Sequence, residues 1–212
     1  MYTELLLALL ETLLMVFASG LIACLLGLPI GVLLSVTRKS QIWENPPFHY
    51  FLSGMVNATR SVPFIILMIA ITPLTRFIMG TSIGVFATLV PLSFAAIPFF
   101  ARTVETAIEE VPDRLIETGL SMGATPMQII RKVLIPEAKS GILSGVTLTL
   151  VSLVGYSAMA GAIGGGGLGA LAFHHGYQRF DTSIMISTVI ILILIVQLIQ
   201  MAGDYAVSIF QH

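Results

Sequence analysis

The stretch that organises the chain covers residues 117–136 and reads ETGLSMGATPMQIIRKVLIP. It is too polar to lie in lipid, and it predicts two short helices joined by a tight turn. Gly123 is expected to end the first helix, because glycine adopts the left-handed conformation at little cost. Thr125 is expected to cap the second helix, with Pro126 at its first position and a glutamine at the third, the pattern of a capping box. Pro136 is expected to end the second helix, because proline removes a backbone donor and clashes with the preceding turn.

The composition indicates an integral membrane protein. The chain has 212 residues, of which 56% are hydrophobic and 10% charged, whereas soluble domains carry about 25% charged residues. The net charge of -1 offers no basic surface to a polyanion, so no nucleic-acid partner is expected. The single cysteine excludes an intrachain disulfide and a cysteine-based metal cluster.

Five apolar stretches are long enough to cross a bilayer, which takes about 20 residues in a helix. The spans are expected at about 12–36, 52–71, 83–101, 142–163 and 184–201, with a polar loop over 102–141. The residues before the first span are expected to lie along the membrane surface. The second span is expected to contain Pro63 and to end at Pro73. The sequence therefore predicts an all-α integral membrane protein with one transmembrane domain over residues 1–212.

Positive charges gather on one side of the predicted spans. If the N-terminus is outside, the inner segments hold Arg38, Lys39, Arg102, Arg114, Arg131, Lys132 and Lys139. The outer segments then hold Arg76 and Arg179. Because cytoplasmic loops are enriched in Lys and Arg, we expect the N-terminus outside, the C-terminus in the cytoplasm, and the 102–141 loop on the cytoplasmic side.

One face of the fourth span carries small and polar residues. At helical spacing it presents Gly145, Thr149, Ser152, Tyr156 and Met159. Polar groups are costly against lipid, so this face turns inward, either toward a transport pathway or toward a neighbouring helix. Ser157 lies on a different side and is a weaker pathway candidate.

The fourth span ends in four consecutive glycines, residues 164–167. Such a run cannot continue a stable helix. It predicts either a hinge or gate, with the unbranched Met159 as a plug beside it, or a simple turn. His174 and His175 are expected to be loop histidines and not metal ligands, because a metal site needs more ligands than the sequence offers here.

The chain carries no signature of catalysis. Its one Lys-Ser pair, Lys139-Ser140, is preceded by Ala138 and lacks a glycine-rich phosphate-binding loop. Neither a nucleophile triad nor a pair of catalytic carboxylates stands out. We therefore expect no enzyme activity and no catalytic residues, and active transport would need a partner ATPase.

The 117–136 stretch resembles the EAA loop of bacterial ABC-importer permeases. The matching positions are Glu117, Thr118, Gly119, Gly123, Val133, Ile135 and Pro136. Thr118 and Gly119 stand where the family has two alanines. The resemblance implies a coupling helix that docks on a separate ATPase subunit, with coupling residues Glu117, Thr118, Gly119, Met122, Gly123, Ala124, Thr125 and Pro126.

Further segments are similar to methionine-importer permeases. They are RSVPFIIL (60–67), GTSIG (80–84), MGATPMQIIRKVLIPEA (122–138), LVGYSAMAGAIGGGGLG (153–169) and GYQRF (176–180). The resemblance implies the type I ABC-importer permease fold in the bacterial cytoplasmic (inner) membrane. It implies a homodimer, a separate ATPase dimer that binds ATP and Mg²⁺, no cofactor of the permease itself, and an extracytoplasmic methionine-binding lipoprotein.

In such a protein methionine would pass between two copies of the chain by alternating access. The residues expected in the path or gate are Thr149, Ser152, Tyr156, Ser157 and Met159. Two alternatives remain open: an osmoprotectant (glycine betaine or choline) permease of the same class, and a secondary transporter or channel that works without an ATPase.

Overall fold

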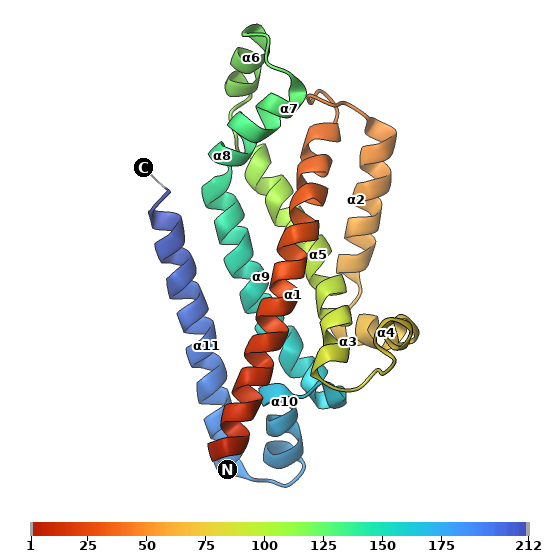
Figure 1. Ribbon diagram of the computed structural model, residues 1–212, viewed down its shortest axis with the longest axis vertical. Coiled ribbons are helices and arrows are strands. Elements are labelled where there is room, and N and C mark those ends of the chain that lie inside the picture. Colours follow the sequence, from red (N-terminus) through yellow and green to blue (C-terminus); the bar gives the residue numbers. More distant parts are fainter. Residues whose placement is uncertain (1, 211–212) are drawn as a thin grey trace.

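The computed structural model describes residues 2–210 and consists of helices joined by short connections over that range (Figure 1). The long helices are α1 (Tyr2–Thr37), α2 (Pro46–Ser61), α5 (Val85–Glu109), α9 (Lys139–Ala160) and α11 (Thr182–Ser208). Among the residues described, four helices are long and apolar enough to cross a membrane, or five spans if the bent pair α2 and α3 (Phe64–Ala70) counts as one. The predicted all-helical membrane fold is confirmed.

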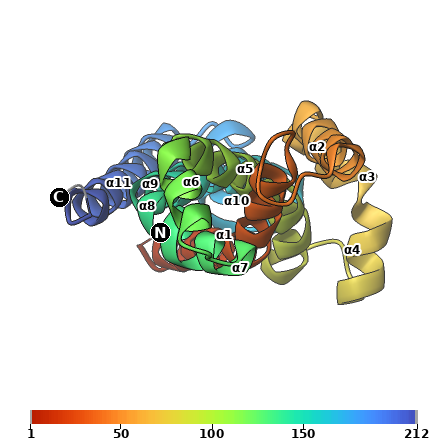
Figure 2. The ribbon, with the colours of Figure 1, turned by 90° about the horizontal axis from the view of Figure 1, so that it is seen from above.

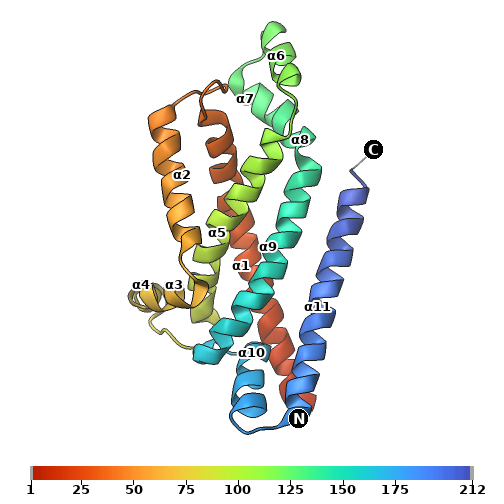
Figure 3. The same ribbon diagram turned by 180° about the vertical axis from the view of Figure 1, so that it is seen from behind.

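Helices α1, α5 and α9 form the middle of the bundle (Figure 2). Figure 2 shows α1, α5 and α9 between α11 on one side and α4 (Thr72–Met79) on the other. The chain enters α1 at one end of the molecule and leaves α11 near the other (Figures 1 and 3). The start of α1 and the end of α11 therefore lie toward opposite ends of the bundle (Figure 1), which is the arrangement that the five predicted spans require.

The most extensive helix contact is between α1 and α5. A Cβ added to Gly31 would lie 2.4 Å from the carbonyl oxygen of Ala101 and 2.6 Å from the Cβ of Val104. A Cβ on Gly27 would lie 2.9 Å from the carbonyl oxygen of Ile97. Small residues let membrane helices approach backbone to backbone, so these two glycines set the distance between the helices.

Helix α1 begins earlier than expected. It is one helix from Tyr2 to Thr37 and runs along the long axis of the molecule without a break at residue 12 (Figure 1). The expectation of a separate surface segment before Thr12 is therefore wrong. A contact between residues far apart in the sequence explains the longer helix. The Glu11 carboxylate accepts a hydrogen bond from the Gly167 N–H at 2.7 Å, and this polar partner allows the charge to lie within the bundle.

The second predicted span is not one straight helix. Helices α2 and α3 meet at 105°, and Pro63 is the N-cap of α3. Val62 adopts an extended conformation, because the ring of a following proline disfavours the helical one. Pro73 does not end the span as expected; it occupies the first turn of α4, where its missing N–H costs nothing.

The other spans differ from expectation mainly at their ends. Helix α5 runs through Pro91 and Pro98 and continues to Glu109, past the predicted end of the span at residue 101, an extension that the glutamates at 105, 109 and 110 indicate in the sequence. Helix α9 covers 139–160 and α11 covers 182–208, somewhat longer than the predicted 184–201. The Asp181 side chain caps α11 by accepting from the Ser183 and Ile184 N–H groups.

The four-glycine run forms a turn that folds the chain back on itself. Gly164, Gly166 and Gly167 have φ of 97°, 85° and 74°, which only glycine adopts without strain. Helix α10 (Gly167–Leu171) follows, and then a π-helical segment, η3 (Ala172–Tyr177). The η3 segment contains His174 and His175, so these residues are helical and the loop expected there is wrong.

The α1–α5 contact generates a stability prediction. Gly31→Ala is expected to destabilise the purified protein by about 1–3 kcal/mol, because the added methyl group overlaps the α5 backbone. Gly54→Ala is the matched control: Gly54 also lies in a helix, and an added Cβ there meets no atom within 4 Å. The measurement is the thermal unfolding temperature in detergent. Equal decreases of the unfolding temperature in the two variants would contradict the packing argument.

Candidate functional site

A helical hairpin projects from one end of the bundle, beyond the ends of α1 and α5 (Figures 1 and 3). It consists of α6 (Asp113–Ser121) and α7 (Pro126–Ile129). Gly123 has a φ of 78°; its N–H donates to the Leu120 carbonyl at 2.9 Å and the Ala124 N–H donates to the Gly119 carbonyl at 3.0 Å. This pair of bonds is a Schellman motif, so the predicted helix end at Gly123 is confirmed.

The predicted capping box at the start of α7 is also present. The Gln128 N–H donates to the Thr125 Oγ1 at 3.4 Å, and the Thr125 N–H donates to the Gln128 Oε1 at 2.9 Å. Pro126 follows in the first turn. Two backbone donors are thus satisfied within the hairpin, so the second arm keeps its helical start without help from the rest of the protein.

Pro136 does not end the second arm. The chain continues from α7 through a π-helical segment, η1 (Ile130–Leu134), into α8 (Ile135–Glu137), and Pro136 lies in the first turn of α8. The wider turn of η1 gives the Ile135 N–H a partner five residues back, at the Ile130 carbonyl. This change of register accommodates the proline, and a break comes only at Ala138, before α9.

Two positions of the hairpin require glycine for different reasons. A Cβ added to Gly119 would lie 3.4 Å from the Ile129 side chain, so Gly119 is where α6 rests against α7. A Cβ added to Gly123 would meet nothing within 4 Å, and its positive φ is what requires glycine. The Thr118 hydroxyl donates to the Arg114 carbonyl at 2.7 Å, so it turns back onto its own helix.

The tip of the hairpin is apolar and exposed. Helix α6 has no buried residue, and Met122 is 82% exposed, Leu120 49% and Met127 43%. An apolar patch at the end of a molecule, outside its transmembrane bundle, is typical of a protein-binding surface. Flexible methionine side chains suit such a surface, because they adapt to the shape of a partner.

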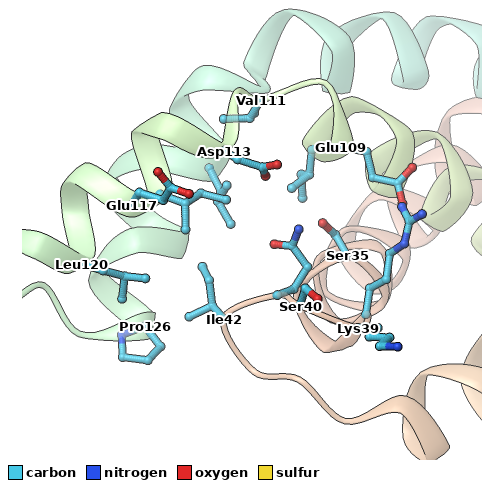
Figure 4. Close-up of a pocket in the computed structure, with 15 residues that line it drawn as sticks. Ser35, Lys39, Ser40, Ile42, Glu109, Val111, Asp113, Glu117, Leu120 and Pro126 are labelled. Carbon is cyan, nitrogen blue, oxygen red and sulfur yellow. The ribbon is translucent and has the colours of Figure 1, made fainter.

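A polar cavity of about 750 Å³ separates the hairpin from the end of α1. In Figure 4, Asp113 and Glu117 of α6 line one side and Lys39, after α1, the other. Arg38 and Glu109 form an ion pair at 2.5 Å at the far edge, which joins the ends of α1 and α5. The cavity therefore offers charges of both signs beside the apolar tip.

The half of the predicted pathway stripe that lies nearer the hairpin is packed against another helix. Thr149 is buried and its hydroxyl donates to the Gly145 carbonyl at 2.7 Å. A Cβ added to Gly145 would lie 2.7 Å from Thr103 Oγ1 on α5. Ser157 is likewise buried, with its hydroxyl donating to the Val154 carbonyl at 2.8 Å. For Thr149 and Ser157, the geometry favours helix packing.

The half of the stripe that lies farther from the hairpin is less buried. Tyr156 stacks on Phe64 of α3, with ring centroids 4.8 Å apart, and both rings line a second cavity, of about 220 Å³. Met159 is 49% exposed and lies on α9 shortly before the glycine turn. Ser152 is partly exposed, with its hydroxyl donating to the Leu148 carbonyl at 2.9 Å. These three positions remain candidates for the pathway.

Sequence reasoning missed two groups of residues near these sites. Glu11 and Thr12 of α1 accept from the N–H groups of Gly167 and Leu168, 156 residues away; the lone charge in an apolar run was the available signal. Arg60 and Phe99 meet beside Tyr156; the sequence places Arg60 near the border of a predicted span, where snorkelling or pairing is expected of an arginine, and gives no sign of these aromatic neighbours. Over residues 2–210, no three metal-binding side chains come together.

Comparison with known proteins gives relatives for almost the whole length. A "Probable D-methionine transport system permease protein MetI" of Vibrio cholerae is 53% identical over 202 residues, which is 95% of this chain and 90% of that protein. The "D-methionine transport system permease protein MetI" of Escherichia coli (strain K12) is 55% identical over 151 residues, 71% of this chain and 70% of that protein.

The fold has a solved counterpart. A structure named "Inward facing conformations of the MetNI methionine ABC transporter: CY5 native crystal form" matches with a TM-score of 0.99 at 48% identity, covering 100% of this chain and 98% of that one. The predicted type I importer-permease fold is thereby confirmed. The model of one protein family, "Binding-protein-dependent transport system inner membrane component", matches residues 27–211. Because this match covers most of the sequence, the chain belongs to that family of transport components.

Proposed function

We propose that this chain is the membrane subunit of an ATP-driven importer of methionine, and that two copies form the translocation path. The observation that carries the proposal is the match along the whole chain to a subunit of a methionine ABC transporter at a TM-score of 0.99. The names of the relatives at 53% and 55% identity point to the same cargo. The exposed, internally capped hairpin supplies the surface that an ATPase requires.

The hairpin is the coupling element of the proposal. Its outer face, with Leu120, Met122 and Met127, docks into a groove on the ATPase, and Asp113 and Glu117 present charge beside it. Its inner face is fixed to the bundle through Ile129 and Leu134, which are buried in a cluster with Phe100 of α5. A displacement of the docked tip is therefore passed to α5 through close-packed side chains.

Nucleotide chemistry belongs to the partner. ATP and Mg²⁺ bind to a dimer of separate ATPase subunits, and this chain needs no cofactor of its own. The hairpin lies in the cytoplasm of a bacterium and the glycine turn on the outer side of the inner membrane, with the N-terminus outside and the C-terminus inside. A methionine-binding lipoprotein delivers the substrate to that outer side.

Substrate identity is tested by uptake. Proteoliposomes that hold the permease with its ATPase and binding protein are expected to accumulate labelled methionine only when ATP is supplied. Labelled glycine betaine and choline are the matched alternatives, and neither should accumulate. Uptake of an osmoprotectant without methionine would overturn the proposed cargo, and uptake without the ATPase would overturn the class.

Docking is tested at the tip. Met122→Asp is expected to reduce co-purification of the ATPase at least about tenfold, because a charge would be buried in an apolar contact. The side chain is 82% exposed, so the thermal stability of the isolated permease should not change. The control is Met79→Asp, another exposed methionine, at the end of α4 on the far half of the molecule. Equal ATPase recovery from both variants would refute the docking surface.

Orientation is tested by thiol labelling. With Cys24 replaced by serine, Arg131→Cys should react with a membrane-impermeant maleimide only after the inner membrane is opened. Tyr177→Cys, whose native side chain is 64% exposed, should react from outside intact spheroplasts. The reverse pattern would place the hairpin in the wrong compartment.

A further inference from the structure

We infer that the cavity among α2, α3, α5 and α9 is a subsite for the transported amino acid, in which Arg60 holds the carboxylate and an aromatic wall holds the apolar side chain. The inference rests on the proposed function and names the site within the path. Its volume is about 220 Å³. Pockets for drug-sized ligands are larger, at roughly 300–1,000 Å³, so this one suits a single small amino acid.

Arg60 is placed to receive an anion. It lies in the last turn of α2, directly before the corner with α3, and this corner is well inside the length of the bundle (Figure 3). Its guanidinium carbon lies 6.0 Å from the centroid of the Phe99 ring. The ion pairs among residues 2–210 are Arg38–Glu109 and Arg102–Glu105, so no described carboxylate pairs with Arg60. Arg60 is exposed in the single chain. An arginine within the length of a membrane bundle and without an acidic partner is a candidate ligand-binding group, and a carboxylate fits its planar fork.

Apart from Thr59, the other residues that line the cavity are apolar or aromatic. Phe64 is buried, and its ring is stacked on that of Tyr156 at 4.8 Å with an interplanar angle of 12°. Val62, Leu67 of α3 and Ala95 of α5 complete the apolar lining. A thioether makes favourable contacts with aromatic rings, so the site combines a cation at one edge with surfaces that favour a methionine side chain.

A polar seam leads from this subsite toward the hairpin end. His49, Ser53, Asn57 and Arg60 recur at helical spacing and share one face of α2. Arg102 of α5 donates to the Asn57 side-chain oxygen at 3.4 Å. Beyond it lies a cavity of about 290 Å³ lined by His49, Ser53, Arg102 and Glu105. A zwitterion released from Arg60 would therefore find polar partners along its way to the cytoplasm.

The subsite is tested with photo-methionine, whose side chain carries a diazirine in place of the thioether. The probe is added below saturation to the purified permease–ATPase complex, irradiated, and the adducts are located by mass spectrometry. In the wild-type complex, adducts are expected on peptides that contain Phe64, Phe99 or Tyr156, and excess methionine should suppress them.

Variants identify the role of the charge. Arg60→Gln is expected to lower these adducts at least about tenfold, since a charge-assisted bond is lost, and Arg60→Lys should restore part of them. Arg76→Gln is the control, because Arg76 pairs with Ser82 outside the cavity. Complex yield and basal ATP hydrolysis report assembly. Adducts undiminished in Arg60→Gln would overturn the role of Arg60.

The wild-type result separates this inference from the proposed function without relying on any variant. A complex that imports methionine but forms no adduct at these three aromatic residues would overturn the subsite and leave the proposed function standing. A complex that imports no methionine would overturn the proposed function itself.

Discussion

The close contact between α1 and α5 is the constraint on which the remaining structure depends. Gly27 and Gly31 bring two backbones together where any side chain would overlap. That contact holds the ends of the two helices side by side, where Arg38 and Glu109 pair at 2.5 Å. The hairpin is built on those ends, because Val36, Phe100, Ile129 and Leu134 share one buried cluster. The hairpin thus has a fixed base although its tip is free.

Two prolines determine where the chain departs from a simple bundle. Pro63 turns α3 away from α2 by 105°, and the corner places Phe64 and Arg60 around one cavity. Pro136 lies inside a helical path that continues, because the π-helical segment before it shifts the hydrogen-bond register. Proline therefore breaks the helical path at Pro63, whereas at Pro136 the helical path continues.

Local chemistry made much of the hairpin predictable. The turn at Gly123 and the capping box at Thr125 and Gln128 depend on residues within a few positions of one another, and both are present. The helical class and the number of apolar stretches follow from composition and run length. The resemblance to importer permeases, read from short motifs, agrees with a family match over residues 27–211.

Features that depend on distant partners could not be predicted. Glu11 was visible as a charge in an apolar run, but its hydrogen-bond partner Gly167 is 156 residues away. The stripe on α9 looked uniform by spacing, yet Gly145 packs against α5 and Thr149 is buried, while Tyr156 lines a cavity. Helix periodicity gives the face on which a residue lies, and only packing shows what stands opposite.

The tightest contact of α1 with α5 lies close to one end of α1, so it divides the helix into a short arm and a long arm. The tightest contact with α5 is at Gly31, six residues before the end of α1 at Thr37 and twenty residues after Glu11, which holds the glycine turn. At about 1.5 Å per residue, these arms are about 9 Å and about 30 Å long. A rigid rocking of α1 about that pivot would move Glu11 about three times as far as Thr37, and in the opposite direction.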